Sequence, residues 1–167
     1  MPAALDRHYW LFKSEPGCFS LADLKNRPEG REKWDGVRNY QARNYLRDDV
    51  KVGDGILFYH SNIPRPAIAG LAEVVQGGYP DWTALDPDAE HYDPNSTPDR
   101  PVWYMVDVRY VLTLPREVTL EEMKRHPDLA GMVLLNRSRL SIQPVMLQQW
   151  EVILRLGGVD PTNYNRY

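Results

Sequence analysis

Four short clusters in the sequence mix aromatic side chains with polar ones, and each lies at the end of a segment patterned like a strand or a helix. The clusters are residues 10–16, 34–40, 58–62 and 137–144. A ligand site commonly forms where the ends of such elements converge on one mouth of a barrel. The clusters therefore predict a single binding pocket.

The residue types in these clusters suit a planar nucleobase, which needs stacking surfaces for its faces and hydrogen-bonding groups for its edge. Trp34 and Tyr59 can supply the faces, and the edge contacts can come from Ser14, Asn39, Ser61 and Asn62. Two arginines near the start of a predicted helix, whose N-terminus favours anions, can hold flanking phosphates. These are Arg38 and Arg43.

Each of these residues also has an ordinary structural interpretation. Asn39 suits the N-terminal cap of a helix, and His60 can be a hydrogen-bonded structural histidine. Phe58 and Tyr59 alternate on one predicted strand, so one of the two must face the core. Trp10, in mid-strand among apolar residues, is expected in the core. Only the clustering of these residues favours a binding site.

The sequence carries no familiar catalytic or nucleotide-binding motif. It has no glycine-rich phosphate loop and no Ser-His-Asp signature. The four histidines, at 8, 60, 91 and 126, lack the spacing of metal ligands, so we expect neither a metal nor a cofactor. Cys18 is the one cysteine, which excludes an internal disulfide and fits a reducing compartment.

Composition fits a globular protein of 167 residues, with 43% hydrophobic and 26% charged residues. No apolar run is long enough to span a membrane, and the N-terminus lacks the layout of a signal peptide, so a cytoplasmic location is expected. The net charge of -3 argues against gripping a duplex by charge alone. The basic residues concentrate between 7 and 47, whereas 81–99 holds six acids and no Lys or Arg.

The elements that must position the clusters are short and irregularly ordered. Strands are predicted at 8–13, 56–60, 67–75, 102–112 and 137–142, helices at 20–26, 39–50, 119–126, 129–135 and 145–156, and a long loop at 79–101. This order lacks the regular alternation of a doubly wound sheet. It predicts an α+β fold in one domain (1–167), a small, mostly antiparallel β-barrel flanked by short helices.

Several longer strings resemble the EVE domain family in sequence, order and spacing. They are YWLFKSEP (9–16), WDGVRNYQARNYLR (34–47), FYHSN (58–62), IAGLAEVV (68–75), GYPD (78–81), HYDP (91–94), WYMVDVRYV (103–111) and RLSIQPV (139–145). The resemblance runs from about His8 to Leu156, leaving a short tail at 157–167. It implies a PUA-like fold, related to the YTH, ASCH and PUA modules.

The resemblance also implies a non-catalytic reader that takes a flipped, modified base, such as a modified cytosine, from DNA or RNA. Carried onto matching positions, it adds Lys13, Ser138 and Arg139 to the pocket, beside Ser14, Trp34, Asn39, Tyr59, Ser61 and Asn62. His60, within the FYHSN string, is a further candidate. The sequence does not distinguish DNA from RNA, because the 2′-hydroxyl contact that decides it is geometric.

Two other functions remain open at this point. An enzyme acting on a nucleotide or an RNA fragment could use Lys13, Glu15 and His60 for acid–base chemistry. A protein-interaction module could instead dock a partner on the acidic loop 81–99 and on exposed aromatic residues.

Overall fold

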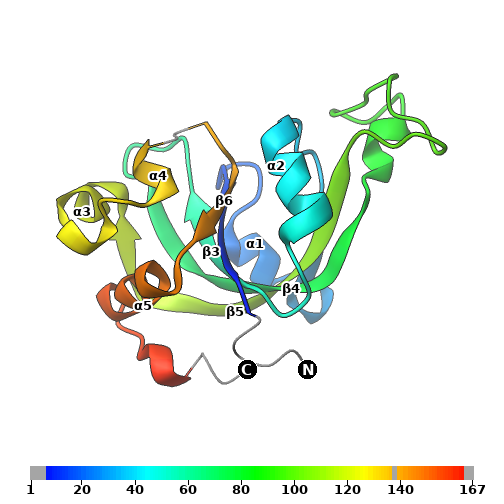
Figure 1. Cartoon of the computed structure of the whole chain (residues 1–167). Coiled ribbons are helices and arrows are strands. Elements are labelled where there is room, and N and C mark those ends of the chain that lie inside the picture. The colour runs from blue at the N-terminus through cyan, green and yellow to red at the C-terminus, as the bar shows by residue number, and fades with distance from the viewer. Residues whose placement is uncertain (1–6, 137–138, 164–167) are drawn as a thin grey trace.

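The computed structural model describes residues 7–136 and 139–163 (Figure 1). Its strands are β1 (Tyr9–Ser14), β2 (Arg31–Trp34), β3 (Gly55–His60), β4 (Ala67–Pro80), β5 (Tyr104–Thr119) and β6 (Ile142–Val145). Its α-helices are α1 (Leu21–Lys25), α2 (Tyr40–Asn44), α3 (Leu120–Arg125), α4 (Val133–Asn136) and α5 (Leu147–Leu156). Short 3-10 turns are η2 (Pro28–Gly30), η4 (Trp82–Leu85), η5 (Pro127–Leu129) and η6 (Pro161–Asn163), and a π-helical turn, η3 (Tyr45–Asp49), continues α2.

One mixed sheet joins all six strands in the order β2-β5-β4-β3-β1-β6. Only the β1–β3 pair is parallel, and the others are antiparallel. The long strands β4 and β5 curve beneath the rest of the molecule, with α3, α4 and α5 toward one end and α2 with the loop 81–103 toward the other (Figure 1). The expected α+β class with a mostly antiparallel sheet is confirmed.

The expected closure into a barrel is not seen. β2 and β6 stand at the two ends of the strand order and are not paired with each other in the described part of the chain. Repeated shifts of register between β4 and β5 and one between β3 and β4 bend the sheet instead, as bulges do in general. The result is a strongly curved open sheet with a concave side.

Apolar residues alternate onto both faces of the sheet, and each face has its own core. Trp10 and Phe12 of β1 pack with Phe58 of β3 under α1, α2 and η3. Leu11 and Leu57, the intervening residues, pack on the other face, under α3, α4 and α5. Because both faces are covered, consecutive residues of β1 and β3 are buried, and the expected core position of Trp10 is confirmed at 4% exposure.

Local sequence signals explain several boundaries. The two predicted capping boxes exist: Ser20 and Asp23 bond each other's backbone at the start of α1, and Thr119 and Glu122 do so at α3. Gly70 pairs with Thr113 of β5 next to a shift in the β4–β5 register. A Cβ there would stand 2.3 Å from the carbonyl oxygen of Leu112, so no larger residue fits.

The structure differs from the expected elements in three places. β2 was not expected, because REKW at 31–34 shows no alternation, yet it pairs with β5 along one edge. β4 and β5 run further than predicted, across residues 76–80 and 113–119, since glycine and proline there lie in bulges and at an edge rather than in a loop. The strand expected at 137–142 lies at 142–145; of that range, 137 and 138 fall outside the described residues.

No helix in the described ranges has both the length and the apolar character needed to cross a membrane. This agrees with the absence of a long apolar run in the sequence.

Candidate functional site

A cavity of about 660 Å³ opens between the ends of β1 and β2, the turn before α1, and the loop 81–99. Aromatic and charged side chains from these four segments meet there. Its lining residues are Lys13, Ser14, Glu15, Cys18, Phe19, Arg27, Glu32, Lys33, Trp34, Asp35, Gly36, Val37, Glu90 and His91. Two of the four predicted clusters, 10–16 and 34–40, thus meet at one site.

Trp34, the leading stacking candidate, forms part of the cavity wall, but most of its ring is in the core. It is 8% exposed and packs against Phe12, Phe58 and Phe19, with ring centroids 5.2, 5.4 and 6.2 Å away. Phe58 and Phe19 meet it edge-on. This packing fixes the orientation of the indole, so the surface that Trp34 offers to a ligand is small and rigid.

Lys13 and Ser14 bring polar groups to the same wall from the end of β1. Burial lowers the pKa of the Lys13 ammonium, and this half-buried donor lines the cavity. The Ser14 hydroxyl donates to the carbonyl oxygen of Phe19 at 2.5 Å. That bond ties the turn before α1 to β1 and sets the position of Phe19.

Tyr59, the second stacking candidate, does not reach this cavity. It is 3% exposed and packs in the core on the opposite face of the sheet from Trp34. Burial raises the pKa of its phenol to about 12. Both Phe58 and Tyr59 are buried, because this sheet has a core on each face.

His60 has the structural role that was its alternative interpretation. Its Nε2 accepts a hydrogen bond from the backbone N–H of Leu21 at 3.1 Å, at the first residue of α1. Its ring meets Phe58 edge-on at 5.6 Å. Burial lowers the pKa of His60, an effect only partly offset by Glu117.

Ser61 and Asn62 also lie outside the cavity wall, although Asn62 influences it. Its side-chain amide donates to Glu15 Oε1 at 3.2 Å, and Glu15 lines the cavity. Of the remaining candidates, Arg139 is exposed and away from the wall, and Ser138 lies outside the described residues.

Asn39 caps α2, where its side-chain oxygen accepts from the N–H of Ala42 at 2.9 Å. The two arginines predicted to hold phosphates are engaged within the protein. Arg38 bonds Asp81 at 3.0 Å and the carbonyl oxygen of His91 at 2.7 Å. Arg43 bonds the carbonyl oxygen of Val102 at 2.6 Å. Both arginines therefore brace the loop against α2.

The centre of this brace is Asp81, whose side chain is buried. It accepts from the N–H of Gly36, from the N–H and hydroxyl of Thr83, and from Arg38, all at 2.5 to 3.0 Å. Burial alone would raise its pKa, but these hydrogen bonds and the guanidinium charge outweigh burial and hold the pKa below the ordinary 3.8.

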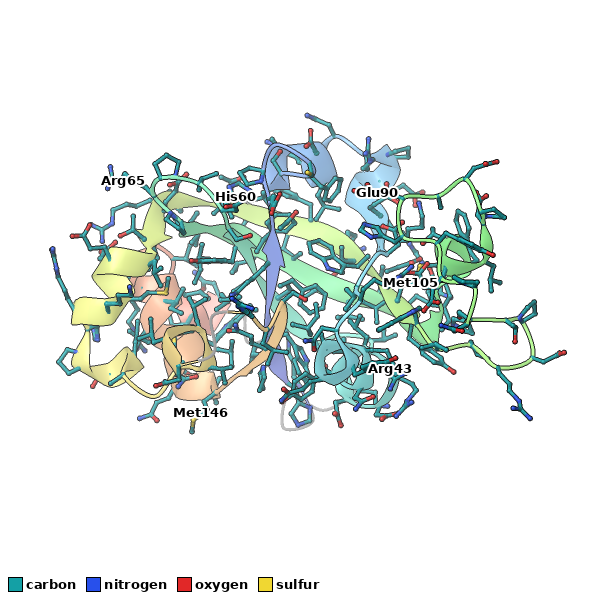
Figure 2. All side chains as sticks on the ribbon, turned by 90° about the horizontal axis from the view of Figure 1, so that it is seen from above. Arg43, His60, Arg65, Glu90, Met105 and Met146 are labelled. Atoms are coloured by element: carbon teal, nitrogen blue, oxygen red, sulfur yellow. The ribbon has the colours of Figure 1, made fainter. Side chains whose placement is uncertain are left out.

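Sequence reasoning missed the contribution of this loop to the cavity. Glu90 and His91 form one wall, and Figure 2 shows Glu90 on the green loop beside the light-blue segment that includes β2. His91 packs so closely on Gly36 that a Cβ there would lie 2.7 Å from its ring. The one usable signal was Asp81 two residues before Thr83, a pair that commonly closes a turn.

The cavity offers both donors and acceptors around its aromatic wall. Four carboxylates (Glu15, Glu32, Asp35, Glu90) and three cations (Lys13, Arg27, Lys33) line it. Within the described ranges, no three His, Cys, Asp or Glu side chains are grouped to hold a metal ion. Such a mixture suits a planar polar ring that carries amino and carbonyl groups on its edge.

Known proteins are similar to this chain in both sequence and architecture. Human thymocyte nuclear protein 1 is 43% identical over 92% of this chain and 76% of its own length. The solved structure of the human THYN1 protein in complex with 5-methylcytosine-containing DNA superposes with a TM-score of 0.86, at 43% identity, covering 92% of this chain and 99% of that one.

A more distant structure, the YTH domain of the Zygosaccharomyces rouxii MRB1 protein, has a TM-score of 0.50 at 16% identity, covering 92% of this chain and 88% of that one. It shares the fold alone, and with the closer structure it supports the PUA-like architecture expected from the sequence. The family model described as the EVE domain matches residues 8–156. The chain therefore belongs to the EVE domain family.

Proposed function

We propose that this protein binds nucleic acid carrying a modified base and holds that base, flipped out of its stack, in the cavity walled by Lys13, Trp34 and Glu90. The observation that carries the proposal is the meeting of an aromatic wall and a half-buried lysine in one cavity that is large enough to admit a base. The likeness to a protein solved with 5-methylcytosine DNA supports it.

The lining groups can read a base by its edge and its shape. Carboxylates accept hydrogen bonds from exocyclic amino groups, and the Lys13 ammonium can donate to a carbonyl oxygen. Phe19, Trp34 and Val37 provide apolar surface for a methyl substituent. An apolar wall distinguishes one methyl group by about 1–3 kcal/mol, so selectivity for the modified base is expected to be modest.

General attraction to the phosphate backbone contributes little to the binding that we propose. The chain has a net charge of -3, and Arg38 and Arg43 are engaged by Asp81 and by carbonyl oxygens. Extrusion of a base costs a few kcal/mol, which stacking of about 1–3 kcal/mol per base can roughly offset. The affinity should therefore be moderate and depend only weakly on salt.

The direct test compares fluorescence anisotropy titrations with oligonucleotides that contain 5-methylcytosine or cytosine at one position, as DNA and as RNA. The variant is Lys13→Met, which keeps the length of the side chain and removes the charge. Its matched control is Lys124→Met on α3, where the lysine is exposed and distant from the cavity. Trp34→Ala is unsuitable, because truncation of this core ring would cost about 3–5 kcal/mol of stability.

We expect the wild type to prefer the methylated oligonucleotide by about tenfold, Lys13→Met to weaken that binding by about tenfold or more, and Lys124→Met to match the wild type. Equal binding of methylated and plain oligonucleotides by the wild type would refute the proposal, and so would an unchanged affinity of Lys13→Met. The DNA and RNA series together identify which polymer is bound.

We propose binding without turnover. Three residues, Lys13, Glu15 and His60, could provide acid–base chemistry in an enzyme. Lys13 and Glu15 line the cavity, but His60 lies outside its wall and accepts a hydrogen bond from the N–H of Leu21. Incubation with nucleotides and short RNA fragments should leave them intact by chromatography. Any product whose formation depends on Lys13 would overturn this part of the proposal.

We also assign the acidic loop 81–99 to the base site rather than to a separate protein surface. Glu90 and His91 lie in the cavity wall, and Arg38 fixes the loop there. Exchange of exposed Asp88 for Asn should leave oligonucleotide binding unchanged. Asp81→Asn should weaken binding, because it loosens the loop that contributes Glu90 and His91 to the cavity wall. If neither change affects binding but both abolish capture of a protein partner, the docking interpretation is favoured.

A further inference from the structure

Trp82 differs from the other tryptophans in its exposure. The remaining four are 8% exposed or less, whereas Trp82 is 54% exposed. Burial of a large aromatic side chain is strongly favourable, so an indole left in water is an unusual feature of a folded protein. Tryptophan is also the residue most often found at contact hot spots.

The backbone that carries Trp82 is held rigidly. Trp82 is the first residue of η4, and Asp81 caps this turn through the N–H and hydroxyl of Thr83. The next two residues, Thr83 and Ala84, are buried. Arg38 and the N–H of Gly36 donate to the other carboxylate oxygen of Asp81, Oδ2. The indole is therefore presented from a fixed position, which lowers the entropic cost of any contact that it makes.

Trp82 stands one side chain away from the candidate cavity. The Lys33 ammonium lies 5.3 Å from the centroid of the indole ring, in a cation–π contact. Lys33 itself lines the cavity and is adjacent in β2 to Trp34, which forms its aromatic wall. An aromatic face, a cation and the base cavity thus follow one another along this rim.

We propose that Trp82 and Lys33 form a second nucleotide subsite, in which Trp82 stacks on the base next to the one held in the cavity and Lys33 contacts the phosphate that joins them. This inference rests on the proposed function and extends it from a single base to a dinucleotide. Stacking on an aromatic ring tolerates any base, so the second subsite adds affinity without adding sequence preference.

The order of groups in a nucleic acid strand matches this arrangement. Consecutive bases are separated by a single phosphate, and here Lys33, whose ammonium also lies 3.6 Å from Glu32 Oε1, both lines the cavity and contacts the exposed ring. The acids of the loop, such as Asp86 and Asp88, are exposed beyond η4, and they disfavour a longer phosphate track in that direction. The subsite is therefore limited to one neighbouring nucleotide.

Two ligands distinguish stacking of the neighbouring base on Trp82 from binding of the modified base in the cavity. One is 5-methyl-2′-deoxycytidine monophosphate, which can occupy only the cavity, and the other is a five-nucleotide single strand with 5-methylcytosine at its centre. The variants are Trp82→Ala and Trp82→Phe. The matched control is Tyr92→Ala, which removes another exposed aromatic ring, 41% exposed, from the same loop.

We expect Trp82→Ala to weaken binding of the pentanucleotide by about tenfold and to change mononucleotide binding by less than about twofold. Trp82→Phe should restore most of the loss, and Tyr92→Ala should resemble the wild type. In the wild type, the pentanucleotide should also protect tryptophan fluorescence from quenching by iodide, because Trp82 is the exposed indole. The mononucleotide should not protect it.

Unchanged pentanucleotide binding by Trp82→Ala, in a wild type that still prefers the methylated strand, would overturn this inference and leave the proposed function intact. An equal loss for both ligands would also overturn it, because Trp82 would then act through the cavity. If the wild type does not distinguish the methylated from the plain pentanucleotide, the proposed function fails, and this inference fails with it.

Discussion

Replacement of Asp81 by Asn tests whether the loop that walls the cavity is held by one buried carboxylate. The change keeps the size of the side chain but turns one acceptor oxygen into an NH₂ donor. Asp81 receives four donated hydrogen bonds, from Gly36, from Thr83 twice and from Arg38. At least one of these donors must then face another donor in a site closed to water.

The expected cost follows from burial and from the partners that remain. Removal of one member of a buried ion pair costs about 3–5 kcal/mol. Arg38 is 20% exposed in its side chain and keeps its bonds to the carbonyl oxygen of His91, so the lower end of this range applies. We therefore expect a loss of about 3 kcal/mol, which lowers the melting temperature by about 9 °C for a chain of this length.

The pH dependence gives an independent check. The pKa of Asp81 is held below 3.8 in the folded protein, so its ionised form stabilises the fold above about pH 4. That contribution is lost as the pH falls through the folded pKa. The stability difference between the wild type and Asp81→Asn should therefore be constant near neutral pH and shrink below pH 4.

Urea and thermal unfolding followed by circular dichroism measure both effects. Asp88→Asn, an exposed acid in the same loop, is the matched control and should stay within about 0.5 kcal/mol of the wild type. A loss of less than about 1 kcal/mol for Asp81→Asn, or an equal loss for the control, would refute the inference that the buried Asp81 carboxylate holds the loop.

Two further changes test the fold around the site. Gly70→Ala places a Cβ 2.3 Å from the carbonyl oxygen of Leu112, so denaturant unfolding should show a loss of about 3 kcal/mol; Gly17→Ala, with no atom within 4 Å of the new Cβ, should be neutral, and equal effects of the two would contradict the close approach of β4 and β5. His60→Ala leaves the Leu21 N–H without its acceptor and should cost about 1 kcal/mol at pH 7. Because burial lowers the folded pKa of His60, the wild type should lose stability as the pH falls below about 6.5, and the variant should lose less; parallel pH profiles would argue against this titration.

The sequence predicted most of the elements because their signals are local. The capping boxes at Ser20 and Thr119 and the apolar strand at 56–60 lie where expected. β2 (Arg31–Trp34) was not predicted, because these four mostly polar residues form a strand only by pairing with β5. The predicted strand ends at residue 75 and the predicted loop begins at Tyr79, but β4 continues to Pro80 through shifts of register with β5.

For the candidate site, two of the four predicted clusters contribute to one cavity, and several of the predicted side chains lie outside its wall. Lys13, Ser14 and Trp34 line one cavity. Tyr59 packs in the core on the other face of the sheet. The alternation of side chains along a strand predicts that Phe58 and Tyr59 point to opposite faces, but it does not predict which of them points toward a ligand. The intramolecular partners of Arg38 are distant in sequence, and no spacing rule could reveal them.

The position of β1 in the sheet also determines the order in which the chain can fold. β1 is the first of the six strands to be synthesised, but its neighbours in the sheet are β3 and β6, the last of the six strands in sequence. Until residues 142–145 emerge, one edge of the apolar strand Tyr9–Ser14 has no partner strand. Such an open edge invites pairing with another chain, and contacts this distant in sequence form slowly. Chains that end before residue 142 should therefore aggregate during synthesis, even though they contain every residue that lines the cavity.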